Sequence, residues 1–339
     1  VARSYVDDQG NEVRLHQDDH LTGPLPVILG IDVGSTSTKA AVCHPDGRVL
    51  LDVYRRTEGD PVGASKKLLG AVRAAAAMFG LDLDVQAVGT TGSGRKIVGT
   101  IVGADGIVNE ISAHVRGAVS VAPGVTTIFE IGGQDSKYMR VSNGRIADAN
   151  MNYVCAAGTG TFVEELGRKL GFSLQEIGDA ALDVAPPHTS DRCTVFMEQD
   201  AHNLEREGAS RREVMAAILY SVIENYRTKV VGNRAVSKDK VVFQGATARN
   251  KGLVAAIEKV FDVQVVVSPY CHVMGAIGAG MLALDALLAR EGSTAFRGLD
   301  VADREVRVTT SNCELCSNRC LITTAHVENL EENPSFGYL

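Results

Sequence analysis

The pattern of hydrophobic and polar residues predicts alternating strands and helices from Val27 onwards. Short apolar runs bounded by turn residues are typical of buried strands, and a long Ala-rich stretch has helical spacing. The predicted elements of this part are strands at 27–33, 38–44, 48–54 and 85–90, a Pro45-Asp46-Gly47 turn, and a helix over 61–80 that stops at Gly80. Such an order is typical of an α/β lobe.

The second half of the chain repeats this style, with Asn143-Gly144 as a hairpin turn. Its predicted strands are 126–133, 136–142, 145–150, 241–245 and 263–268, and its helices lie near 160–170, 211–231, 250–260 and 275–290. Residues 1–26 are polar and rich in turn residues, so we expect a leader or linker with one hairpin around Asp8-Gln9-Gly10.

One internal repeat stands out. Asp32-Val33-Gly34-Ser35-Thr36-Ser37-Thr38-Lys39 aligns without gaps on Glu130-Ile131-Gly132-Gly133-Gln134-Asp135-Ser136-Lys137. In both copies an apolar strand ends in an acidic residue, and a Gly turn and a Lys follow. Two copies predict two related lobes, each presenting a hairpin loop to a common cleft. A chance match between two β-hairpins is the alternative.

The repeated loops have the composition of a phosphate site. Glycine lets backbone N–H groups approach a triphosphate, and hydroxyls add donors. The pattern is neither a P-loop nor a dinucleotide fingerprint. We therefore predict that Gly34, Ser35, Thr36, Ser37, Thr38 and Lys39 (loop 1, 34–39) and Gly132, Gly133 and Gln134 (in loop 2, 132–136) bind ATP or ADP.

Acidic and amide side chains in the same repeat suit hydrolysis. Asp32 and Glu130 could hold Mg²⁺ largely through water, because Mg²⁺ keeps much of its hydration shell. Gln134 and Asp135 could orient the attacking water. The predicted catalytic residues are thus Asp32, Glu130, Gln134 and Asp135, with Asp32 also a magnesium ligand through water.

A third Gly-rich turn follows the strand Val241-Val242-Phe243-Gln244. It could pack against adenine and ribose, although many strand-to-helix connections look like it. The candidate contacts are Gly245, Ala246, Asn250 and Lys251.

Composition excludes several other functions. The 339 residues carry 34 basic and 41 acidic side chains, a formal charge of −7, so nucleic acid is not an expected partner. Aromatic residues make up 5% and Trp is absent, which argues against a stacking platform. We find no apolar run of membrane-spanning length and no secretory signal pattern, and therefore predict a cytoplasmic protein without a membrane partner.

The seven cysteines are an odd number, which favours a reducing compartment over a disulfide framework. Cys43 and Cys271 lie in apolar surroundings and are interpreted as packing residues. Cys155 comes just ahead of a predicted helix, whose N-terminus favours a thiolate or an anionic cluster. Cys193 also precedes a helix-like stretch, and for each of these two cysteines alone a silent thiol is the alternative.

The tail contains Cys313-Glu314-Leu315-Cys316-Ser317-Asn318-Arg319-Cys320. This spacing could form a three-thiolate cradle for zinc or a cluster, with a fourth ligand from elsewhere. An exposed cysteine-rich tail is the alternative.

Six segments together resemble one protein family. They are LGIDVGSTSTKAAV, EIGGQDSKYM, NYVCAAGTGTFVE, CTVFMEQD, FQGATARNKGL and MGAIGAGMLAL, spread over about residues 27–290. The chain resembles the ATP-dependent activators of 2-hydroxyacyl-CoA dehydratases and the ATPase subunits of benzoyl-CoA reductases. These belong to the superfamily of actin, the sugar kinases and the chaperone ATPase domain.

The resemblance implies a fold and an organisation. The fold would be a two-lobed, ribonuclease H-like α/β architecture, with duplicated βββαβα lobes around a nucleotide cleft. The expected segments are a leader (1–26), lobe I (27–122), lobe II (123–268), a C-terminal helix returning to lobe I (269–292) and a cysteine-containing tail (293–339). The tail looks like the region that follows the activator module in long multidomain homologues.

The resemblance also implies a mechanism. A homodimer would share one [4Fe-4S] cluster, held by Cys155 and Cys193 of each chain, with Ala157 and Gly158 as nucleotide contacts. ATP hydrolysis would drive a low-potential electron from a ferredoxin-like or flavodoxin-like donor to a dehydratase or reductase acceptor.

Two other functions stay open at this point. A small-molecule kinase of the same superfamily would need a substrate-binding Asp base and would give the two cysteines no role. A non-hydrolysing nucleotide-binding module would serve as an assembly platform.

Overall fold

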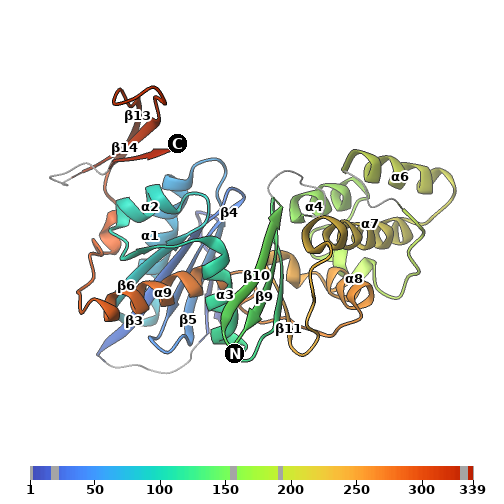
Figure 1. The fold of residues 1–339 in the computed structure, drawn as a ribbon, viewed down its shortest axis with the longest axis horizontal. Helices are drawn as coiled ribbons and strands as arrows, with labels where there is room; N and C mark the ends of the chain where they lie inside the picture. Colours follow the sequence, from blue (N-terminus) through green and yellow to red (C-terminus); the bar gives the residue numbers. More distant parts are fainter. Residues whose placement is uncertain (1–2, 17–22, 153–158, 190–193, 329–334, 339) are drawn as a thin grey trace. The chain divides into compact units, whose positions relative to one another are not determined.

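The computed structural model describes residues 3–16, 23–152, 159–189, 194–328 and 335–338. They form two compact units (Figure 1). Unit 1 comprises residues 1–117 and 275–339, and unit 2 comprises residues 118–274.

Both units are built on a sheet with the same strand order. The unit 1 sheet runs β1-β2-β5-β4-β3-β6-β7, and the unit 2 sheet runs β10-β9-β8-β11-β12. In each, three consecutive antiparallel strands are followed by two strands that pair in parallel. The five-strand order β5-β4-β3-β6-β7 therefore recurs as β10-β9-β8-β11-β12, as a duplicated lobe requires.

The strand bounds agree closely with the sequence pattern in both units. The strands are β1 (Arg3–Val6), β2 (Glu12–Leu15), β3 (Pro24–Val33), β4 (Ser37–Cys43), β5 (Val49–Arg56), β6 (Asp82–Thr91), β7 (Gly106–Ile107), β8 (Thr127–Ile131), β9 (Ser136–Ser142), β10 (Arg145–Asn152), β11 (Val241–Gln244) and β12 (Val265–Val266). The strand predicted at 263–268 is wrong in length, because only two of its residues pair with β11.

The helices fill the connections between these strands. They are α1 (Pro61–Phe79), α2 (Arg95–Val102), α3 (Glu110–Val121), α4 (Gly160–Lys169), α5 (Glu176–Ala180), α6 (Thr194–Arg206), α7 (Arg211–Tyr226), α8 (Lys251–Phe261) and α9 (Met274–Ala289). Gly80 ends α1, as predicted, and adopts the left-handed conformation. The helix predicted over 211–231 is α-helical to Tyr226 and continues as a π-turn over Arg227–Val231.

The N-terminal hairpin is part of the unit 1 sheet. Strands β1 and β2 form the predicted hairpin, and β2 pairs antiparallel with β5. Asp52 is fully buried on β5. Its carboxylate lies 3.0 Å from Arg14 Nη1 of β2 and 2.5 Å from Nε2 of His16, the residue after β2. The Arg14 guanidinium and the contact with His16 offset the cost of burying this carboxylate.

Helix α9 lies directly on the backbone of the unit 1 sheet. A Cβ atom at Gly30 of β3 would stand 1.7 Å from the Ala276 carbonyl oxygen, and one at Gly89 of β6 would stand 1.9 Å from that of Ala279. Only glycine permits this approach, so the small residues of the helix and the sheet fix its position.

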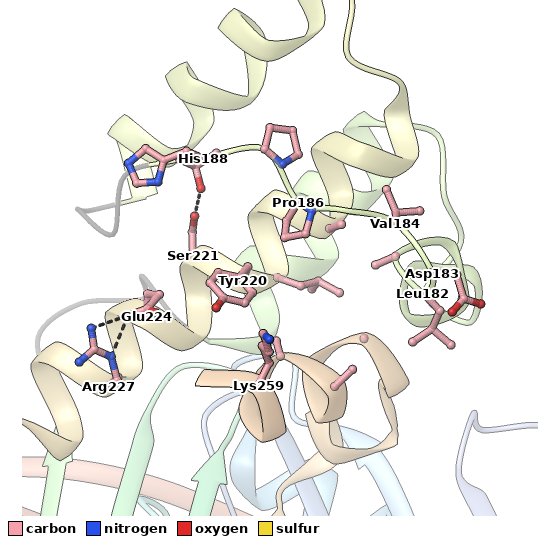
Figure 2. Close-up of a pocket in the computed structure, with 18 residues that line it drawn as sticks. Leu182, Asp183, Val184, Pro186, His188, Tyr220, Ser221, Glu224, Arg227 and Lys259 are labelled. Carbon is pink, nitrogen blue, oxygen red and sulfur yellow. Dashed lines mark hydrogen bonds and ion pairs between the residues drawn. The ribbon is translucent and has the colours of Figure 1, made fainter. Parts of the chain in front are cut away.

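Unit 2 contains a cavity of about 980 Å³ between α7, α8 and residues 181–189 (Figure 2). Small residues such as Ala216 and Ala256 leave the space, and Tyr220, Glu224 and Lys259 lie at its wall. Every described residue that was predicted to contact nucleotide lies outside this lining.

The tail adds a small sheet of β13 (Val306–Asn312), β14 (Leu321–Val327) and β15 (Ser335–Tyr338), ordered β13-β14-β15 (Figure 1). Ala325 and Val327 of β14 join the unit 1 core. In the described part of the chain, no helix is long and apolar enough to cross a membrane.

Candidate functional site

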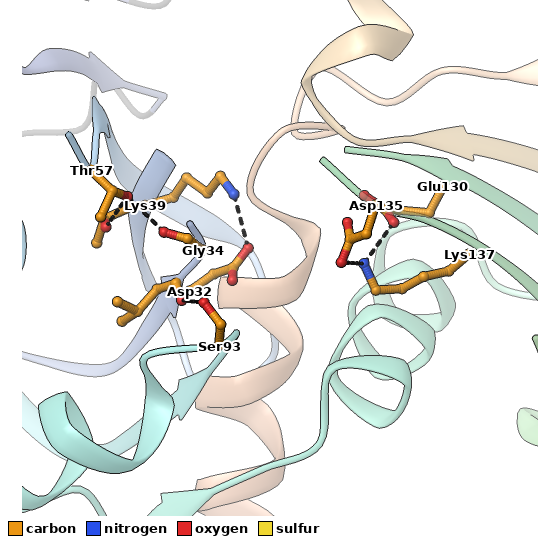
Figure 3. A network of polar contacts seen from close by, with 10 residues as sticks. Asp32, Gly34, Lys39, Thr57, Ser93, Glu130, Asp135 and Lys137 are labelled. Atoms are coloured by element: carbon orange, nitrogen blue, oxygen red, sulfur yellow. Dashed lines mark hydrogen bonds and ion pairs between the residues drawn. The ribbon is translucent and has the colours of Figure 1, made fainter. Parts of the chain in front are cut away.

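Loop 1 is the tight connection between β3 and β4. Asp32 and Lys39 lie opposite each other in the strand register, and Lys39 Nζ is 3.2 Å from Asp32 Oδ2 (Figure 3). The Gly34 N–H donates to the Ser37 carbonyl at 3.1 Å and closes the turn. Both charged side chains are largely buried, with 15% of Lys39 and 10% of Asp32 exposed.

The hydroxyl groups at loop 1 differ in whether they form hydrogen bonds within the protein. Thr38 Oγ1 is 2.9 Å from Thr57 Oγ1, and Thr57 Oγ1 donates to the Gly34 carbonyl at 2.7 Å. Thr36 Oγ1, by contrast, is buried and has no hydrogen-bond partner in the protein. A buried hydroxyl without a partner is costly, and it marks the tip of loop 1 as a place for an acceptor such as a phosphate oxygen.

Loop 2 repeats this geometry between β8 and β9. Glu130 and Lys137 lie opposite each other in the strand register, and Lys137 Nζ is 3.0 Å from Glu130 Oε2. The Gly132 N–H donates to the Asp135 carbonyl at 2.9 Å. Each of these contacts joins residues at the aligned positions of loop 1. The predicted repeat is therefore present in the register, the turn hydrogen bond and the acid–Lys pair.

Loop 2 differs from loop 1 in its charge. Lys137 has a second carboxylate partner, Asp135, also at 3.0 Å, and only 2% of the lysine side chain is exposed (Figure 3). The Tyr226 hydroxyl donates to the Lys137 carbonyl at 2.7 Å. Burial and the nearby Glu130 raise the pKa of Tyr226 well above its ordinary value, so this donor keeps its proton.

The start of α4 is joined to loop 2. The Gly160 N–H donates to the Gly132 carbonyl at 2.9 Å, and the Thr161 N–H donates to the Gly133 carbonyl at 3.0 Å. These are two of the N–H groups that a helix leaves unpaired at its start. The first turn of α4 is therefore held directly against loop 2 by backbone hydrogen bonds.

The third loop, residues 245–250, also contacts the end of β8. A Cβ at Gly245 would stand 2.3 Å from the Ile131 carbonyl oxygen, and Thr247 Oγ1 donates to the same oxygen at 2.5 Å. Gly245 has a φ of 94°. In unit 2 the structure thus brings together loop 2, the third loop and the N-terminus of α4.

Sequence reasoning missed a matching turn in unit 1. Gly92 follows β6 as Gly245 follows β11, and both strands run parallel to the strand that carries the acid. A Cβ at Gly92 would stand 2.5 Å from the Val33 carbonyl oxygen and 2.8 Å from Asp32 Oδ1. The signal was present, because in both segments a strand ends in a polar residue followed by glycine (Thr91-Gly92 and Gln244-Gly245).

Asn250 and Lys251 have structural partners. Asn250 Oδ1 accepts from the Leu253 N–H at 3.0 Å and caps α8. Lys251 is exposed and lies 2.9 Å from Asp179. Their predicted nucleotide contacts stay predictions.

The predicted cluster ligands Cys155 and Cys193, with Ala157 and Gly158, lie outside the described residues. The structure describes the helices that follow each cysteine. Helices α4 and α6 are linked by Lys169, which lies 2.5 Å from Glu198 of α6. Among the described residues, no three His, Cys, Asp or Glu side chains are grouped so that they could hold a metal ion.

Comparisons with known proteins identify the family. The model of the BadF/BadG/BcrA/BcrD ATPase family matches residues 29–283. An uncharacterized protein of Methanocaldococcus jannaschii is 36% identical over 262 residues, covering 76% of this chain and 62% of that protein, so the chain spans less than two thirds of this relative.

Two further relatives have described roles. The activator of lactoyl-CoA dehydratase from Anaerotignum propionicum is 35% identical, with 76% of this chain and 97% of that protein covered. The solved activator of 2-hydroxyisocaproyl-CoA dehydratase from Clostridium difficile, with bound ADPNP, has a TM-score of 0.67 at 29% identity, covering 78% of this chain and 97% of that one. The predicted two-lobed ATPase fold and the predicted family are both confirmed: the chain belongs to the BadF/BadG/BcrA/BcrD ATPase family.

Proposed function

We propose that this chain is a cytoplasmic ATPase that uses ATP hydrolysis to deliver a low-potential electron to a dehydratase or reductase. The observation that carries the proposal is the repeated loop. Two hairpins with the same register, turn hydrogen bond and acid–Lys pair are poor candidates for chance. The relatives named activators, and the one solved with ADPNP, support the same function.

Loop 1 is proposed to hold phosphate oxygens. Its repeat segment, residues 32–39, contains one carboxylate and one ammonium, so its formal charge is zero. The unpartnered Thr36 hydroxyl can donate to a phosphate oxygen. Gly34 keeps the turn free of a side chain that would meet the Ser37 carbonyl at 2.9 Å.

Loop 2 is proposed to serve hydrolysis. Residues 130–137 contain Glu130, Asp135 and Lys137, a formal charge of −1. An extra carboxylate repels phosphate but suits the water shell of Mg²⁺. Gln134, at the tip between these groups, is proposed to orient a water molecule.

The link from loop 2 to the cysteines is short. Gly160, whose N–H is bound to loop 2, lies five positions after Cys155. A movement of the Gly132 carbonyl would therefore shift the start of α4. A [4Fe-4S] cluster held by Cys155 and Cys193 of two chains would supply the electron. The expected donor is a ferredoxin or flavodoxin-like protein.

Anaerobic purification tests this proposal. We expect about four iron and four sulfide per two chains, together with ATP hydrolysis. Cys155→Ser and Cys193→Ser should each lose the iron, whereas Cys316→Ser, an exposed cysteine of the tail, should retain it. Iron content unchanged in both Cys155→Ser and Cys193→Ser would refute the cluster, and phosphate transfer to a small-molecule acceptor would support a kinase instead.

A further inference from the structure

The tail hairpin places two cysteines opposite each other. Strands β13 and β14 pair antiparallel up to Asn312 and Leu321, so Cys313 and Cys320 are the next pair in register. The Cys313 N–H donates to the Cys320 carbonyl at 2.8 Å, which confirms that the pairing continues to these residues. Opposite residues of an antiparallel pair point to the same face of the sheet.

The spacing of this pair suits a disulfide. Cα atoms of a hydrogen-bonded antiparallel pair are about 5.5 Å apart, within the range of about 4.4–6.8 Å that disulfides span. Both thiols are free and half-buried, and Cys316 is exposed on the turn between them. Since β14 is anchored in the unit 1 core through Ala325 and Val327, the framework of the hairpin is fixed.

The three thiols of this hairpin do not form a metal centre in the structure, which has no such group among its described residues. The pair also lies outside the segment 29–283 that matches the family.

We propose that Cys313 and Cys320 form a dithiol–disulfide exchange site whose substrates are disulfides of small thiols. One thiolate attacks a sulfur of the substrate, the substrate S–S bond breaks, and the first small thiolate leaves. The second cysteine thiolate then attacks the protein sulfur of this mixed disulfide and releases the second small thiolate. Two cysteine thiols are oxidised, one substrate disulfide is reduced to two thiols, and the two cysteine protons pass to the released thiolates.

The second step is favoured by the strand pairing. Two groups held on adjacent strands have an effective concentration at least in the millimolar range. The internal disulfide should therefore close faster than free thiol at lower concentration can reverse the mixed disulfide. Cys316, which has no strand partner in the pairing, should stop at the mixed disulfide.

A peptide-mapping experiment on the full chain tests this proposal. The reduced chain is treated with glutathione disulfide, quenched in acid and digested with trypsin. Trypsin cleaves after Arg319, so a Cys313–Cys320 bond joins two peptides, whereas a Cys313–Cys316 bond stays within one. Cys316→Ser is the matched control, because it excludes a bond between residues 316 and 320. We expect the joined peptides in the wild type and in Cys316→Ser, and one bound glutathione at the remaining thiol of the pair in Cys313→Ser and Cys320→Ser.

Three results would overturn the proposal. One is a Cys316→Ser chain with separate glutathione adducts on Cys313 and Cys320, and another is a wild type in which the bond includes Cys316. The third is a purified chain with one zinc or iron at the hairpin that each of the three Cys→Ser changes removes. The Cys313→Ser/Cys320→Ser double variant should hydrolyse ATP at the wild-type rate, so the ATPase proposal is tested separately.

Discussion

Loops 1 and 2 have the same backbone register and turn hydrogen bond, but they differ in the polar side chains that they bury. Loop 1 pairs one lysine with one carboxylate and leaves the Thr36 hydroxyl without a partner. Loop 2 surrounds a lysine that is 2% exposed with two carboxylates, and joins α4 and the third loop. The difference teaches that a duplicated turn can keep its register and its turn hydrogen bond while the two copies bury different polar groups.

The largest expected difference between the loops is in stability. Lys137→Met leaves two buried or partly buried carboxylates without their cation, and breaking a buried pair in this way costs about 3–5 kcal/mol. Lys39→Met should cost less than Lys137→Met, because the Lys39 side chain is 15% exposed and the Lys137 side chain is 2% exposed. Denaturant unfolding measures both.

A double variant controls this experiment. Lys137→Met combined with Glu130→Gln removes the buried charge as well as its partner, so it should recover part of the lost stability. Equal losses of unfolding free energy for Lys39→Met and Lys137→Met would mean that the two lysines contribute equally to stability.

The second expected difference is in the kinetics of ATP hydrolysis. It is measured at the aligned residues Gln134 and Thr36, at the tips of the two loops. Gln134→Ala should lower kcat for ATP about 100-fold with little change in KM, because it removes the group proposed to orient water. Thr36→Val should raise KM about tenfold, the loss of one hydrogen bond to a charged oxygen. Steady-state phosphate release checks both, and a swapped pattern would reverse the roles assigned to the loops.

The third comparison uses the two matching glycines. Gly245→Ala and Gly92→Ala each place a methyl group within 2.5 Å of a carbonyl oxygen at positive φ, and each should cost about 2 kcal/mol in unfolding free energy. Gly124 also has positive φ but would meet nothing within 4 Å, so Gly124→Ala should cost about 1 kcal/mol. If Gly92→Ala behaves like Gly124→Ala, the duplication does not extend to this turn.

The smallest expected effect concerns the extra carboxylate of loop 2. Asp135 is 37% exposed, so Asp135→Asn should change stability by less than about 1 kcal/mol. It should still raise the Mg²⁺ concentration for half-maximal ATPase activity about threefold, because one charged member of the proposed metal shell is lost. Asp46→Asn, in an exposed turn of unit 1, is the control and should change neither.

Sequence reasoning found the parts of the site that depend on local order. The hairpins of Asp32–Lys39 and Glu130–Lys137 could be predicted because strand period, glycine and charge all lie within eight residues. The same holds for the Asn143-Gly144 turn, whose residues both have positive φ.

The missed features depend on contacts between distant residues. Gly160 is 28 positions from Gly132, and Arg14 is 38 positions from Asp52, so no local pattern reveals either contact. The turn at Gly92 was missed because its resemblance to the turn at Gly245 depends on strand pairing. The resemblance becomes visible only once β6 is seen to pair in parallel with β3, as β11 pairs with β8. The roles of Cys155 and Cys193 stay predictions.

The hairpin β1–β2 extends the unit 1 sheet beyond β5. It covers the outer edge of β5, and an uncovered edge offers unpaired N–H and C=O groups to other chains. A chain shortened to the matched segment 29–283 would lose that cover, and Asp52 would lose its contacts with Arg14 and His16. We therefore expect removal of the residues before this segment to be seen first as aggregation.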